Sequence, residues 1–250
     1  EGTPFEAQAR MALLAIYERS RDWAQASDIA QRMQAAQQGD FSTRQAHYLC
    51  EQALPLAARG ELQAAQALLE QAVATAPQAP RARIEMARLQ QRMGRPDAAL
   101  ATLQALADSA PAALALAAPL LVETALASGR AQQAGALLQQ HYQDMPSLDL
   151  LEAIVSLQTA TDGAPGAGRE WYVRHLDKEP SLVAATKWLA DETLGHEQFH
   201  PQIQRALEQA AKPLTRYRCA ACGFEARQHF WQCPGCQTWD SYPARRVEEL

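Results

Sequence analysis

Large aromatic side chains are scarce in this sequence: they make up 6% of its 250 residues, although 48% of the residues are hydrophobic. Alanine supplies much of the apolar share, which favours closely packed helices with small contact residues over one thick core. The H-E-x-x-H, G-x-S-x-G, Walker A and G-x-G-x-x-G motifs are also absent. We therefore expect a protein that is not an enzyme.

Long apolar runs and a strong charge of one sign are missing as well. We find no run of about 18 apolar residues, and so expect no membrane span in this chain. The formal net charge of −5 offers no overall attraction for nucleic acid or for an anionic membrane surface. The sequence shows no signal-peptide pattern. Because it begins with Glu1 and not with a methionine, we expect a missing preceding segment that could hold a membrane anchor.

Cysteine is limited to five residues, and one of them, Cys50, stands alone inside a helical pattern. A lone cysteine of this kind is commonly a small buried hydrophobic residue. The other four form one group near the end of the chain, which is poor evidence for the disulfide framework of a secreted protein. A reducing cytosol fits this cysteine usage better.

The most extensive pattern that is present is a repeat. It contains glycine-centred turns that are 34, 35 and 34 residues apart, at Gly60, Gly94, Gly129 and Gly163. A proline follows each glycine at a fixed distance: Pro77, Pro111, Pro146 and Pro180. A small residue lies five positions after each glycine: Ala65, Ala99, Ala134 and Gly168. A period of about 34 residues with these features resembles the tetratricopeptide repeat.

Each repeat is expected to be a pair of helices, with glycine at positive φ in the turn and proline after the second helix. An earlier unit around Trp23 and a divergent hairpin from Ser181 to about Lys212 extend the array to five repeats and a closing hairpin. The first helix should start at Pro4 with Thr3 as its cap. We predict an all-α tetratricopeptide-repeat superhelix, an α-solenoid, over residues 1–212.

The first helix of each repeat should line the inner groove of the array, and in the third repeat this helix is basic. Helical spacing places Arg81, Arg88 and Arg92 on one face. One interpretation is a solvated helix face; the other is a patch that clamps an acidic peptide, since guanidinium groups pair well with carboxylates. These three arginines are our candidate partner-binding residues. Pro55 and Pro119 fall inside predicted helices and are expected to kink them.

The remaining cysteines form two C-x-x-C pairs, Cys219 with Cys222 and Cys233 with Cys236, with ten residues between the pairs. Such a pair lets one tight turn present both sulfurs to a single ion, and backbone N–H groups near Gly223 can offset the thiolate charge. We predict that the four cysteines ligate one zinc or iron ion, with zinc slightly favoured in recombinant protein. The alternatives are two disulfides or free thiols. The ten intervening residues are expected to form two short strands.

Residues 212–250 carry six basic and four acidic side chains, a formal charge of +2. Four thiolates around a divalent ion carry −2, so little positive field remains and we expect no nucleic-acid binding. So small a segment should need its metal to fold. Its surplus of aromatic residues and its short link to the helices predict that it docks on the closing hairpin, near Trp188 or Leu207.

The patterns YRC-x-x-CGF and W-x-CP-x-C resemble the rubredoxin-like metal-binding domain of the lipopolysaccharide assembly protein B family, where this domain follows tetratricopeptide repeats. Besides the cysteines, the likeness is carried by Tyr217, Gly223, Phe224, Trp231 and Pro234. It implies a rubredoxin-like zinc-ribbon domain over residues 213–250. Family members begin with a membrane-anchoring helix and further repeats, so the resemblance also implies that this chain is a cytosolic fragment.

The resemblance implies a non-enzymatic adaptor that regulates lipopolysaccharide biosynthesis at the cytosolic face of the bacterial inner membrane. The implied partners are the lipid A deacetylase, a membrane-bound ATP-dependent metalloprotease that degrades it, and other lipopolysaccharide assembly proteins; an oligomer is compatible with this role. The alternative is a rubredoxin-like electron-transfer module on a repeat scaffold, because four-cysteine sites also hold iron. Partner contacts cannot be transferred from the family residue by residue.

Overall fold

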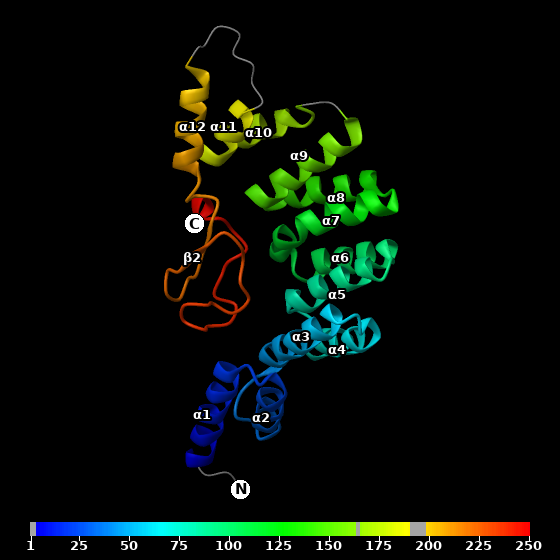
Figure 1. Cartoon of the computed structure of the whole chain (residues 1–250), viewed down its shortest axis with the longest axis vertical. Helices are drawn as coiled ribbons and strands as arrows, with labels where there is room; N and C mark the ends of the chain where they lie inside the picture. The colour runs from blue at the N-terminus through cyan, green and yellow to red at the C-terminus, as the bar shows by residue number, and fades with distance from the viewer. Residues whose placement is uncertain (1–3, 164–165, 191–198) are drawn as a thin grey trace. The chain divides into compact units, whose positions relative to one another are not determined.

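The computed structural model describes residues 4–163, 166–190 and 199–250, and within these ranges the chain forms twelve α-helices in successive antiparallel pairs (Figure 1). The residues divide into two compact units, Glu1–Pro111 and Ala112–Leu250. The first unit contains α1 (Pro4–Ser20), α2 (Trp23–Ala35), α3 (Ser42–Ala58), α4 (Leu62–Thr75), α5 (Pro80–Arg92) and α6 (Pro96–Ser109). The second contains α7 (Leu114–Ser128), α8 (Ala131–Asp144), α9 (Leu148–Asp162), α10 (Arg169–Leu176), α11 (Leu182–Ala190) and α12 (His200–Ala211).

The repeat features have the structural roles that the sequence predicts. The four turn glycines have φ angles of 84°, 71°, 68° and 65°, in the left-handed region that favours glycine. Ala65, Ala99 and Ala134 are completely buried, so the paired helices approach closely at these points. The fifth repeat uses Gly168, where an added Cβ would lie 3.2 Å from the Cα of Val155. The predicted all-α repeat fold is confirmed.

Proline marks the helix boundaries as expected, and the first helix begins at Pro4; its predicted cap Thr3 lies outside the described residues. Pro55 and Pro119 lie inside α3 and α7, which both continue past them. The kinks expected there stay predictions. The closing hairpin consists of α11 and α12, and residues 191–198 between them are not described.

One stretch of the described residues is long and apolar enough to span a membrane by length and composition, although it is not an uninterrupted apolar run, and the expected absence of a membrane span stays a prediction. Residues Pro111–Ser128, which include α7, have a mean hydropathy of 1.5 over 18 residues, and 56% of this stretch is buried inside the structure. Glu123 and Thr124 interrupt the run, which is why a search for uninterrupted apolar residues overlooks it. A helix that is apolar on several faces is typical of a buried core helix as well as of a membrane span.

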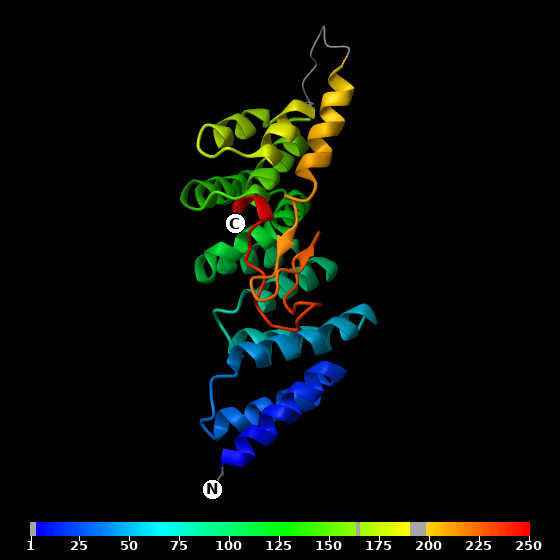
Figure 2. The ribbon, with the colours of Figure 1, turned by 90° about the vertical axis from the view of Figure 1, so that its left-hand side faces the viewer.

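The segment after α12 forms a small ribbon in the second unit. Strands β1 (Tyr217–Arg218) and β2 (Glu225–Ala226) pair antiparallel, with Tyr217 opposite Ala226 and Arg218 opposite Glu225. A single antiparallel bridge joins Gln232 to Trp239, and the 3₁₀-helix η2 (Val247–Glu249) follows. The strands therefore flank the first cysteine pair, and the prediction of two strands between the pairs was wrong for β1. In both views the ribbon lies beside α7 and α9 (Figures 1 and 2).

Candidate metal centre

Two turns of nearly identical backbone geometry present the cysteines. In the first turn, the N–H of Cys219 donates to the carbonyl of Phe224 and the N–H of Gly223 donates to the carbonyl of Cys219, both at 2.9 Å. In the second, the N–H of Cys233 donates to the carbonyl of Thr238 at 2.9 Å, and the N–H of Gln237 donates to the carbonyl of Cys233 at 2.8 Å. The ribbon is thus an internal duplication of one cysteine-bearing turn.

The left-handed position of this turn is occupied by different residues in the two copies. Gly223 has φ 77° in the first copy and Gln237 has φ 60° in the second. A residue with a Cβ pays a conformational cost of about 1–2 kcal/mol in this region. The second turn is therefore held in place against a local strain that the first turn avoids.

The four sulfur atoms converge on one point. All lie within 4.8 Å of one another, with 3.8 Å between Cys219 and Cys236 and 3.7 Å between Cys222 and Cys233. A tetrahedral ion with metal–sulfur distances of about 2.3 Å requires sulfur–sulfur distances of about 3.8 Å. All four cysteines are free thiols in the structure, so the alternative of two disulfides is not realised. The arrangement fits one metal ion, and four thiolates suit zinc and iron alike.

Hydrogen bonds prepare part of the cluster for a cation. Burial raises the pKa of Cys219, but the hydroxyl of Ser241 and the backbone N–H groups of Cys222 and Ala221 outweigh it and lower this pKa to about 6. The pKa of Cys236 is lowered by the side chain and backbone N–H of Thr238. These contacts favour thiolates, which are the form that binds metal.

Deprotonation of one thiol also makes deprotonation of its neighbours less favourable, because adjacent thiolates repel one another. For Cys222 the backbone N–H of Phe224 lowers the pKa, but desolvation and the neighbouring cysteines raise it to about 12. A divalent cation removes this mutual repulsion and would release the remaining protons on binding. The ion would supply the charge compensation that lets four sulfurs share one site.

The cluster has a buried side and an exposed side. Cys219 and Cys233 are buried, whereas Cys222 and Cys236 are exposed. Tyr242 closes the buried side: its ring packs with the two buried cysteines, and its hydroxyl donates to the carbonyl of Phe224 at 3.0 Å. The site is therefore a surface site on a small aromatic support.

A buried carboxylate on α9 fastens the ribbon to the helices. Asp149 is 5% exposed, and one of its oxygens accepts a hydrogen bond of 2.8 Å from the hydroxyl of Tyr217. Its other oxygen pairs with the guanidinium of Arg246, whose Nε lies 3.0 Å away. This guanidinium stacks over the ring of Tyr217 at 5.0 Å and donates to the carbonyl of Thr215 at 2.7 Å. We call Tyr217, Asp149 and Arg246 the docking triad.

The segment after Arg246 caps two helices of the repeat array. Glu249 accepts a hydrogen bond from the N–H of Leu148 at 2.9 Å, at the first residue of α9. Glu248 accepts from the N–H of Leu182 at 2.6 Å and from the hydroxyl of Ser181 at 2.7 Å, at the start of α11. Carboxylates at helix N-termini satisfy free N–H groups and complement the helix dipole. Two adjacent glutamates thereby tie two successive first helices together.

The ribbon was predicted to dock on the closing hairpin near Trp188 or Leu207, and its tail does contact the start of that hairpin at Ser181 and Leu182. The ribbon also packs on Leu116 of α7 and donates a hydrogen bond to Asp149 of α9, while its tail bonds the N-terminal end of α11. Trp188, the expected contact, instead carries the guanidinium of Arg169 over its ring at 5.0 Å. Polar groups and helix ends position the ribbon, whereas the prediction rested on its surplus of aromatic residues and its short link to the helices. The sequence signal for these contacts was the charged tail, with Arg245, Arg246, Glu248 and Glu249, together with the serines Ser147 and Ser181 that precede α9 and α11.

The three candidate arginines occupy different environments in the first unit. Arg81 is 4% exposed, pairs with Glu51 of the preceding repeat at 2.5 Å and lies 3.4 Å from His47. Arg88 is half exposed and pairs with Glu85 at 3.0 Å, while Arg92 donates to the carbonyl of Ala57 at 2.7 Å. Arg81 therefore links two repeats inside the unit. A role of these residues in partner binding stays a prediction.

Arg88 and Arg92 border a cleft of about 290 Å³ between α3 and α5. The other residues that line it are mainly apolar: Ala53, Leu54, Ala57, Leu69, Glu85 and Leu89. Leu54 is 40% exposed there. We call this surface the basic cleft.

Two parts of the chain match known families. Residues 217–242 match the rubredoxin metal binding domain, and residues 56–121 match the tetratricopeptide repeat. A solved structure of PilF from Pseudomonas aeruginosa is 15% identical, covers 68% of this chain and 78% of its own, and has a TM-score of 0.47.

Similarity to curated proteins extends along the sequence. Lipopolysaccharide assembly protein B of Escherichia coli K12 is 25% identical over 255 residues, which are 99% of this chain and 65% of that protein. The Haemophilus influenzae protein of the same name is 22% identical and covers 95% of this chain and 61% of its own. The chain thus spans less than two thirds of the length of these relatives. The chain is therefore similar to lipopolysaccharide assembly protein B along almost its whole length, and its match to the tetratricopeptide repeat precedes its match to the rubredoxin metal binding domain.

Proposed function

We propose that the chain is a non-enzymatic adaptor in lipopolysaccharide assembly, and that its helical units are surfaces for binding other proteins. The observation that carries this proposal is the docking triad: a four-cysteine ribbon is fixed to the repeats by buried polar contacts, not carried on a free tether. Such a junction makes a rigid composite surface, as recognition of a protein partner requires. Similarity to lipopolysaccharide assembly protein B along 99% of the chain supports the same role.

The proposed adaptor brings two partner proteins together. The adaptor presents the lipid A deacetylase to a membrane-bound ATP-dependent metalloprotease, at the cytosolic face of the bacterial inner membrane. Residues 1–212 serve as the binding array and residues 213–250 as a metal-dependent docking element. A segment outside this sequence anchors the protein to the membrane.

The basic cleft is the first surface that we propose for partner binding. Its apolar floor suits an aliphatic side chain, and Leu54 remains available at its rim. Two arginines and one glutamate border it, so the rim carries one excess positive charge. A partner segment with a carboxylate beside an apolar residue complements both features.

The metal has a structural role in this proposal: it holds the ribbon in the shape that docks. Zinc-loaded, colourless native protein would agree with that role. A visible absorption band that bleaches reversibly on reduction would instead support the electron-transfer alternative.

A pull-down from bacterial lysate tests the adaptor role, with detection of the lipid A deacetylase and the protease by mass spectrometry. Four baits are compared: the wild-type chain, Cys219→Ser combined with Cys222→Ser, Arg88→Glu, and the control Arg32→Glu. Arg32 is an exposed arginine on α2, well suited as a control because it also pairs within its own helix. The wild type and control should retain the deacetylase, while the other two baits should lose it. Recovery of neither protein on wild-type bait would refute the proposal.

A further inference from the structure

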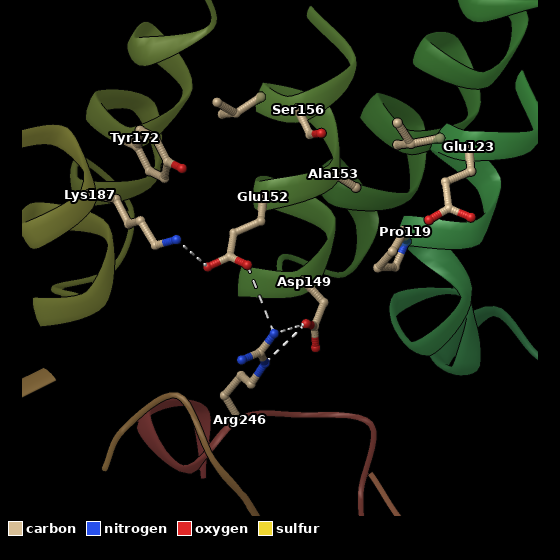
Figure 3. Close-up of a pocket in the computed structure, with 11 residues that line it drawn as sticks. Pro119, Glu123, Asp149, Glu152, Ala153, Ser156, Tyr172, Lys187 and Arg246 are labelled. Carbon is tan, nitrogen blue, oxygen red and sulfur yellow. Dashed lines mark hydrogen bonds and ion pairs between the residues drawn. The ribbon is translucent and has the colours of Figure 1, made fainter. Parts of the chain in front are cut away.

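The second unit contains a groove of about 440 Å³ that the adaptor role does not yet explain (Figure 3). Its walls come from α7, α9, α10 and α11, and Arg246 of the docking triad closes one end. We call it the acidic groove. Because Arg246 belongs to the segment that follows the ribbon, the groove is complete only when the ribbon is docked.

The floor of the acidic groove is apolar and rigid. It contains Pro119 and Val122 of α7, Ala153 of α9 and Tyr172 of α10. Val122, Ala153 and Tyr172 are each largely buried, so they are held by the core behind them. A floor of this kind can accept an aliphatic side chain without rearrangement.

The rim carries three carboxylates and two cations, which leaves one negative charge in excess. Asp149 is fully engaged by the docking triad. Among the residues that the structure describes, Glu152 has two long ion pairs, 3.6 Å to Lys187 and 3.9 Å to Arg246. Glu123 is exposed, and the structure gives it no ion pair with any of the residues described.

The two incompletely neutralised carboxylates lie on opposite sides of the floor. Figure 3 shows Glu123 on α7, across Pro119 and Ala153 from Glu152, with Lys187 beyond it. A long cationic side chain could rest its methylene groups on the apolar floor and place its charge beside Glu123. A phosphate or carboxylate in the same position would meet repulsion from both glutamates.

We propose that the acidic groove binds a segment of a partner protein in which a lysine or arginine stands next to an aliphatic residue. The aliphatic residue packs on Pro119 and Val122, and the cation pairs with Glu123. This proposal rests on the adaptor function and adds a second surface whose charge preference is opposite to that of the basic cleft. The two units thereby select chemically different segments.

The test is selection of a displayed random-peptide library on the immobilised, metal-loaded full chain. Peptides that bind are counter-selected on Glu123→Lys, and the affinities of enriched peptides are measured by fluorescence anisotropy. Three further variants are compared: Glu123→Gln removes the charge, Ser156→Trp fills the groove from an exposed position, and Glu170→Gln is a control on an exposed glutamate of α10.

Enriched peptides should carry a lysine or arginine beside an aliphatic residue. Glu123→Gln should weaken them about threefold and Glu123→Lys about tenfold. Ser156→Trp should abolish binding, Glu170→Gln should leave it unchanged, and acetylation of the peptide lysine should have the effect of Glu123→Gln.

Three results would overturn the proposal: no enriched peptide, enrichment without a basic residue, or affinities that do not depend on Glu123. None of them bears on capture of the deacetylase in the pull-down. The groove and the adaptor function can therefore fail separately.

Discussion

The helical repeats and the metal ribbon are held together in different ways. In the repeats the same small-residue contact recurs in each pair of helices, as at the fully buried Ala65, Ala99 and Ala134. In the ribbon a few contacts act once each: four thiols, one docking triad and two capping glutamates. A substitution in one repeat interface removes one of several similar stabilising contacts, whereas loss of the metal site removes the main interaction that stabilises the ribbon. The repeats should therefore lose stability gradually and the ribbon all at once.

Replacing Cys219→Ser together with Cys222→Ser should give the largest effect. Metal binding at such sites contributes about 10–16 kcal/mol at neutral pH, and its loss should unfold the ribbon while the repeats stay helical. Circular dichroism should keep most of its helical signal, while limited proteolysis should cut within residues 213–250. Removal of the metal by a chelator should produce the same cleavage pattern.

Cys50→Ala is the matched control, because Cys50 is completely buried in the repeats. It should lower the free energy of unfolding modestly and leave the metal content unchanged. A metal-free double variant with a protease-resistant ribbon would show that the repeats alone support the ribbon, and the contrast between the two regions would disappear.

Asp149→Ala should have the next largest effect, since it leaves the partly buried guanidinium of Arg246 without its main partner. Breaking a buried pair in this way costs about 3–5 kcal/mol. Urea unfolding should show this loss, together with easier cleavage near Thr215. Glu152→Ala, which removes only ion pairs of 3.6 Å and 3.9 Å, should cost less than about 1 kcal/mol. Equal losses for the two variants would mean that the triad is not the main attachment.

Two glycine substitutions compare turns within the repeats. Gly129→Ala places a Cβ in open space at φ 68°. It should lower the free energy of unfolding by about 1–2 kcal/mol, because a residue with a Cβ is strained in this backbone conformation. Gly168→Ala has φ 83° and also brings the Cβ to 3.2 Å from the Cα of Val155 and 2.8 Å from Oε1 of Gln158. It should cost at least about 1 kcal/mol more. Urea midpoints measured by circular dichroism would reveal the order, and the reverse order would contradict close packing at Gly168.

The smallest predicted effect is an increase in the stability of the ribbon. Gln237→Gly should relieve the left-handed strain in the second cysteine turn and stabilise the ribbon by up to about 1 kcal/mol, after the extra entropy of glycine in the unfolded chain. Competition with a chelator should show slightly tighter metal binding. Gly223→Gln is the reciprocal substitution in the first cysteine turn, and it should weaken metal binding. Weaker binding in Gln237→Gly would mean that the glutamine side chain contributes more than its backbone costs.

The parts of the structure that could be predicted from sequence are those encoded locally or periodically. The convergence of the four cysteines could be predicted because two C-x-x-C pairs fix their geometry within a few residues. The repeat fold was found because glycine, alanine and proline recur at one period. Both patterns can be recognised in the sequence without knowing which distant residues are in contact in the folded protein.

The parts that escaped prediction depend on polar contacts between distant positions. Asp149 looks like any acidic residue in a first helical turn until Tyr217 and Arg246 are placed beside it. Arg81 lies on the expected helix face, but a helix pattern does not reveal that Glu51 of the neighbouring repeat will bury it. Specific pairings of this kind follow from tertiary packing, so the composition and periodicity of each segment do not identify which residues will pair.

The two capping glutamates have a consequence for the order of folding. Leu148 and Glu249 are 101 positions apart, so at about 5–20 residues per second the ribosome delivers the cap of α9 on the order of 5–20 seconds after the helix itself. The repeats of the first unit, whose contacts are mostly between neighbouring helices, can fold as each pair emerges. The second unit must keep α9 and α11 incompletely capped until the ribbon has been made and has bound its metal. Because we expect the ribbon to need its metal to fold, metal supply during synthesis should set the time at which the second unit completes its folding.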